Sequence, residues 1–117
     1  MSINQQELSN SIIQNHSFLR GMYQDSYFPT ACVDKTKAIL LALCAAIESK
    51  NPQTLPELYE LTHAATDKIN DLQEYFYQND SEIETAARDC IAVNFEKIAQ
   101  AYGFDADLET LVANRDW

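Results

Sequence analysis

The chain has 117 residues, of which 18 are Asp or Glu and 8 are Lys or Arg, so its formal net charge is −10 at pH 7. A chain of this length is expected to form one domain, residues 1–117, that buries a core without metal or disulfide support. The charge argues against nucleic acid or an anionic membrane as partner, because binding to either depends on Lys and Arg. Two Gly and three Pro are too few for the turns of a small β-sandwich. The composition therefore predicts an acidic, all-α domain.

Two short helical segments are predicted at the start of the chain. Leu8, Ile12 and Ile13 have helical spacing, which indicates a first helix over residues 3–14. A further helical turn is expected over residues 18–23.

A connector and a long buried helix follow. Pro29 disfavours helix at the residue before it, so residues 25–30 are expected to be a connector, with Tyr27 and Phe28 packed on the core. Residues 31–50 are apolar on nearly every side, which is typical of a helix at the centre of its domain.

The next helix is predicted over residues 54–78. Thr54 and Glu57 have the spacing of a capping box, in which each satisfies a backbone N–H of the first turn. Apolar side chains then recur with the helical period. They are Leu58, Leu61, Ala65, Ile69, Leu72 and Phe76.

A last long helix is predicted over residues 83–102, starting at a second capping box formed by Ser81 and Glu84. Gly103 is well placed to end it in the left-handed conformation, and Asp105 can cap a final short helix. The pattern predicts a compact bundle of about four to five helices. Trp117 is expected to pack onto this bundle.

The cysteines and the start of the chain point to a cytoplasmic protein. Residues 1–20 have neither the basic start nor the apolar stretch of a signal peptide. The longest apolar run, residues 38–47, is about half as long as a membrane span. Cys32, Cys44 and Cys90 are odd in number and form no C-x-x-C motif, so reduced thiols that act as small hydrophobic groups are expected.

The net charge lies entirely in the second half of the chain. Residues 1–50 carry four acids and four bases, whereas residues 51–117 carry fourteen acids and four bases. Five acids are spaced so that they share one face of the helix over residues 54–78. This acidic stripe consists of Glu57, Glu60, Asp67, Asp71 and Glu74. It is either a solvated face that keeps the protein soluble, or a docking surface with Tyr59, Tyr75 and Tyr77 as nearby aromatic anchors.

Catalytic chemistry has little support in the sequence. Glu60 and His63 form an E-x-x-H motif, which is half of a carboxylate-bridged di-iron site, but the chain has no second copy. Cys90 has Arg88 nearby to lower its thiol pKa, but Asp89 adjoins it and opposes the effect. There is no glycine-rich phosphate loop and no G-x-S-x-G motif. We therefore expect a non-enzymatic protein with no catalytic residue, cofactor or metal.

Several segments resemble a family of small acidic bacterial proteins without an assigned activity. These segments are residues 21–29, 33–40, 61–66, 81–88 and 101–105. Some members of the family resemble immunity proteins of contact-dependent growth inhibition systems, which bind and neutralise a toxin domain inside the cell. The resemblance implies that the partner is a cognate basic toxin domain. This toxin domain would be a nuclease, and one option is a ribonuclease A-like nuclease. The acidic stripe would then occlude the cationic cleft of the toxin. The alternatives are a small metal- or thiol-dependent enzyme using Glu60, His63 or Cys90, and a generic acidic interaction module.

Overall fold

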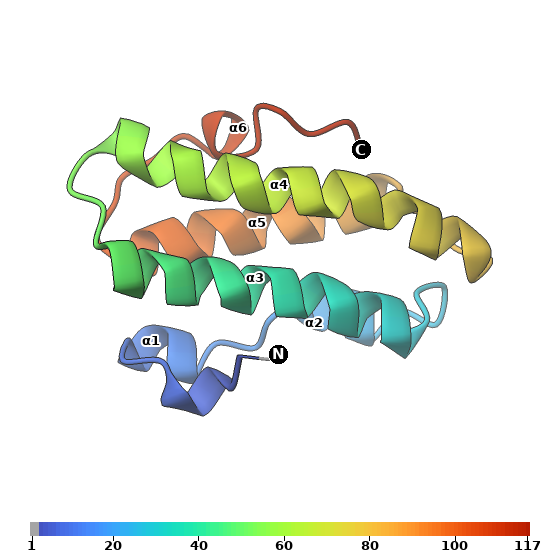
Figure 1. Cartoon of the computed structure of the whole chain (residues 1–117). Coiled ribbons are helices and arrows are strands. Elements are labelled where there is room, and N and C mark those ends of the chain that lie inside the picture. The colour runs from blue at the N-terminus through green and yellow to red at the C-terminus, as the bar shows by residue number, and fades with distance from the viewer. Residues whose placement is uncertain (1–2) are drawn as a thin grey trace.

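The computed structural model describes residues 3–117, and these residues form helices and connecting segments without any strand. Three long helices lie side by side, and the short helices cover their outer surfaces (Figure 1). The all-α prediction is therefore confirmed. No helix within the described range is long and apolar enough to cross a membrane. The elements in chain order are the 3₁₀ helix η1 (Gln5–Glu7), α1 (Ser11–Gln14), α2 (Arg20–Tyr23), α3 (Thr30–Lys50), α4 (Leu55–Gln78), α5 (Thr85–Ala101) and α6 (Leu108–Leu111).

Helix α3 packs against α4 and α2 and has buried residues from Cys32 to Ile47. It begins directly after Pro29 and ends at Asn51, which adopts the left-handed conformation with φ 48°. Its buried side chains face several neighbouring elements, because apolar residues cover most of the helix surface. They are Cys32, Val33, Thr36, Leu40, Leu41, Leu43, Cys44 and Ile47.

Helix α4 packs along α3 and follows the predicted pattern closely. The Thr54 hydroxyl accepts a hydrogen bond from the backbone N–H of Glu57 at 3.3 Å. The Glu57 carboxylate accepts from the backbone N–H of Gln53 at 3.0 Å and from the Thr54 hydroxyl at 3.1 Å. These bonds satisfy donors that the first turn would otherwise leave free. The buried face contains Leu58, Thr62, Ala65, Thr66, Ile69 and Phe76.

Helix α5 begins later than the sequence predicts. The prediction that Ser81 and Glu84 form a second capping box is therefore wrong. The first residue of the helix is Thr85, and Glu84 is the N-cap without a side-chain hydrogen bond. The Ser81 hydroxyl instead donates to the backbone carbonyl of Tyr27 at 3.1 Å and ties two connectors together. The Ser81 hydroxyl, which the sequence pattern assigned to the helix cap, thus forms a tertiary hydrogen bond instead. The left-handed Gly103 after the helix is confirmed, with φ 85°.

The prediction of one continuous helix over residues 3–14 is also wrong, because this segment forms two separate short helices, η1 and α1. Asn4 caps η1, and the side chain of Asn10 caps α1 by accepting from the N–H groups of Ile12 and Ile13. Asparagine competes with the helix backbone in this way, which explains the break between the two pieces. Ile13 is buried but Ile12 is 63% exposed.

The end of the chain packs against α4. Asp107, two residues beyond the predicted Asp105, caps α6 by accepting from the N–H of Thr110. The residues after α6 run alongside α4 (Figure 1). Trp117 is only 8% exposed, which confirms that it packs onto the bundle.

Candidate functional site

All five residues of the acidic stripe are exposed on α4, on the side away from its buried face. Asp67 and Asp71 are four residues apart, and Asp71 and Glu74 are three apart, so like charges are neighbours along the helix. Each such pair destabilises a helix by about 0.2–0.5 kcal/mol. The stripe is therefore a surface that local helix stability disfavours.

The stripe has almost no neutralising partners. The one ion pair among residues 3–117 joins Arg115 to Glu109, at 3.3 Å, and involves no residue of the stripe. Lys68 is exposed between stripe residues and forms no ion pair within that range. The N–H of Gln53 and the hydroxyl of Thr54 hold the pKa of Glu57 below its ordinary value. Within residues 3–117, no carboxylate of the stripe is therefore neutralised by an ion pair.

The three tyrosines expected near the stripe lie in different surroundings. Tyr77 is 56% exposed and can contact a partner. Tyr75 is half-buried under the ammonium group of Lys35, which lies 4.8 Å from the ring centroid. Tyr59 is half-buried and stacks on His63, with ring centroids 6.0 Å apart. Only Tyr77 keeps the exposure that an aromatic anchor requires.

A second acidic region lies where the connector before α3 meets the segment between α4 and α5. Asp25, Tyr27, Glu82 and Glu84 line a hollow of about 490 Å³. Tyr27 is 44% exposed, so its predicted burial is wrong, whereas Phe28 is buried as expected. Partial burial and the nearby carboxylates raise the pKa of the Tyr27 hydroxyl. The sequence alone does not predict that these acids lie together. They meet because the two segments that carry them are joined by the Ser81–Tyr27 hydrogen bond, between residues 54 positions apart.

His63 has a structural role. Its Nε2 donates to the backbone carbonyl of Thr110 at 2.8 Å, which joins α4 to α6. Glu60 is exposed on the acidic stripe. Among residues 3–117, no group of three or more His, Cys, Asp and Glu side chains is arranged to hold a metal ion.

The three cysteines are free thiols in environments that favour the protonated form. Cys32 and Cys44 are buried and Cys90 is half-buried. Burial raises the pKa of all three thiols, for Cys44 to about 12. The thiolate is the reactive form of cysteine, so these positions are poor nucleophiles at neutral pH.

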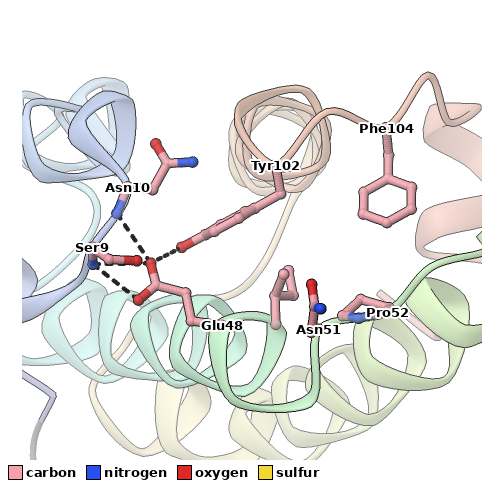
Figure 2. Close-up of a pocket in the computed structure, with 8 residues that line it drawn as sticks. Ser9, Asn10, Glu48, Asn51, Pro52, Tyr102 and Phe104 are labelled. Carbon is pink, nitrogen blue, oxygen red and sulfur yellow. Dashed lines mark hydrogen bonds between the residues drawn. The ribbon is translucent and has the colours of Figure 1, made fainter.

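A further hollow of about 280 Å³ lies where α1, α3 and α5 meet (Figure 2). Glu48 extends into it, and its carboxylate accepts from the N–H groups of Ser9 and Asn10 and from the Tyr102 hydroxyl at 2.6 Å. Burial raises the pKa of Glu48, but these hydrogen bonds outweigh it and hold the pKa below its ordinary value. The carboxylate is thus hydrogen-bonded to the protein's own donors. Through these bonds, Glu48 connects α3 to the segment before α1 and to the residue after α5.

The fold and surface define a small all-α bundle with an unneutralised acidic helix. Residues 12–117 match the model of a family described as a family of unknown function, DUF5713. The chain belongs to that family. It has no significant match among the curated proteins or the solved structures.

Proposed function

We propose that this protein is an immunity protein that binds a cognate basic toxin domain, a nuclease, and blocks its active cleft. The observation that supports the proposal best is the acidic stripe on α4, whose five exposed carboxylates make no ion pair within the described chain. The resemblance of several segments to immunity proteins of contact-dependent growth inhibition systems supports it as well. The proposed inhibitor acts in the cytoplasm without catalytic residues, metal or cofactor.

The charge of the stripe explains how such an inhibitor would recognise its target. A nuclease holds a polyanion, so its cleft is expected to be rich in Lys and Arg. A helix that presents carboxylates to that cleft takes the place of substrate phosphates and accelerates association by long-range attraction. On this proposal, the repulsion between neighbouring carboxylates lowers the stability of α4 but strengthens the attraction of the stripe to a basic cleft.

The decisive measurement is the association rate constant with a toxin domain, whose gene we expect directly upstream of the gene for this protein. We expect Asp67→Lys, Asp71→Lys and Glu74→Lys together to lower this constant at least tenfold at low ionic strength, since steering contributes about 10- to 1,000-fold. Adding salt should reduce the difference, because it screens exposed charges.

A matched control separates the position of the charges from their number. The variant Glu7→Lys, Asp89→Lys, Asp105→Lys reverses three exposed acids outside α4. Each reversal adds two positive charges, so both triple variants have a formal net charge of −10 + 6 = −4. Equal rate constants for the two variants would reduce the stripe to a solvated face, and the absence of a toxin gene beside this one would remove the proposed partner.

A further inference from the structure

Residues 113–117, here called the strap, lie along one side of α4 and are attached to it by polar side chains. The Asn114 side chain donates to the backbone carbonyl of His63 at 2.9 Å. Asn70 donates to the backbone carbonyl of Asn114 at 3.0 Å and accepts from the N–H of Asp116 at 3.0 Å. The strap therefore follows α4 through contacts that water can replace one by one.

An aromatic ring fixes the end of the strap. Trp117 is buried, and the guanidinium group of Arg115 lies 5.4 Å from the centroid of its ring. Burial of this large ring favours the closed position. Since Trp117 is the only tryptophan of the chain, its fluorescence reports on the strap alone.

The closed strap also contains two polar atoms that lose water without gaining a partner. Asn114 Oδ1 and Trp117 Nε1 are the buried side-chain oxygen and nitrogen atoms that lack a hydrogen bond within residues 3–117. A buried polar group without a partner carries its full desolvation penalty. Both atoms belong to residues of the strap, so this penalty falls on the strap.

We propose that the strap opens and closes on α4 as a separate unit while the helical bundle stays folded. Segments with few backbone hydrogen bonds and replaceable side-chain contacts open at lower free energy than the core. The closed strap also positions one residue of the acidic stripe, because Asn114 Nδ2 donates to Asp67 Oδ1 at 2.7 Å. Opening of the strap removes the hydrogen bond that positions the Asp67 carboxylate and exposes Trp117 to water.

The test compares two signals from the whole protein during urea denaturation. Trp117 fluorescence follows the strap, and circular dichroism at 222 nm follows the helices. We expect the fluorescence midpoint to lie roughly 1 M lower in urea than the dichroism midpoint. Coincident midpoints would show that the strap unfolds only with the bundle, which overturns the proposal.

A pair of Asn variants makes the test specific. Asn114→Ala removes the bonds to His63 and Asp67, and we expect it to lower the fluorescence midpoint further without moving the dichroism midpoint. Asn79→Ala is the control, since Asn79 follows the last residue of α4 and its Nδ2 donates to the carbonyl of Tyr75 and not to a residue of the strap. If Asn114→Ala moves both midpoints equally, the strap is an integral part of the bundle.

The positioning of Asp67 is tested by binding, and this step rests on the proposed function. We expect Asn114→Ala and Asp67→Asn each to lower the association rate constant with the toxin roughly two- to threefold, and the double variant to lower it no further than Asp67→Asn. Additive effects would show that Asn114 does not act through Asp67. A toxin that does not bind the unmodified protein overturns the proposed function, whereas the urea result for the strap stands.

Discussion

Glu48 joins three segments that are distant in sequence, so its replacement should destabilise the whole fold. In Glu48→Gln the side chain keeps its size but loses the charged acceptor. The bonds affected are those from the N–H groups of Ser9 and Asn10, at 2.9 and 3.2 Å, and from the Tyr102 hydroxyl at 2.6 Å.

The expected loss of stability can be derived from these contacts. A hydrogen bond to a charged group contributes about 1.5–3 kcal/mol. Glu48 is only half-buried, so solvent screens part of this contribution, and the amide oxygen of Gln can still accept one bond. We expect a loss of about 2 kcal/mol in the free energy of unfolding. For a chain of this length, that loss lowers Tm by roughly 8 °C.

The pH dependence follows from the lowered pKa of Glu48. A carboxylate whose pKa is lower in the folded state than in the unfolded state stabilises the fold above its ordinary pKa. This contribution is lost as the pH falls through the folded-state pKa. The difference between the unmodified protein and Glu48→Gln should therefore be constant near neutral pH and shrink below about pH 4.3.

Urea denaturation followed by circular dichroism at about pH 7 and about pH 3.5 measures both effects. Glu7→Gln is the matched control, because Glu7 is exposed in η1. The reasoning fails if Glu48→Gln is no less stable than this control, or if the loss of stability is the same at both pH values.

Three further predictions concern the core, a helix cap and the thiols. Phe76→Ala should lower the free energy of unfolding by about 3–5 kcal/mol in urea denaturation, because the ring is fully buried; a loss below 1 kcal/mol would contradict this burial. Thr54→Ala should lower it by about 0.5–2 kcal/mol, since the N–H of Glu57 loses its acceptor, and an unchanged midpoint would show that the cap is dispensable. Cys44 and Cys90 should react with a disulfide reagent at least tenfold more slowly in the native protein than in urea at neutral pH, since burial raises both thiol pKa values. Fast native labelling of Cys90 would revive a role for a reactive thiol.

Much of the fold follows from local pattern. The helical period of the apolar residues and the capping pair of Thr54 and Glu57 are sufficient to place α4 within one or two residues. The same periodicity determines that the five acids share a face, because residue spacing on a helix converts directly into direction. The left-handed conformation at Gly103 follows from the absence of a Cβ atom. In these cases the physical cause lies within a few residues of its effect.

Tertiary structure decided what depends on partners distant in the chain. Ser81 bonds to the connector at Tyr27 and does not cap α5, and Tyr75 is half-buried under the ammonium group of Lys35. The hydrogen bonds of Glu48 and the contact between the strap and Asp67 likewise join residues 39 to 54 positions apart. A side-chain hydrogen bond is chosen among all donors and acceptors that the packed helices bring within about 3 Å. The sequence alone thus determined the net negative charge and the alignment of five acids on α4, while packing decided which of the neighbouring side chains are exposed.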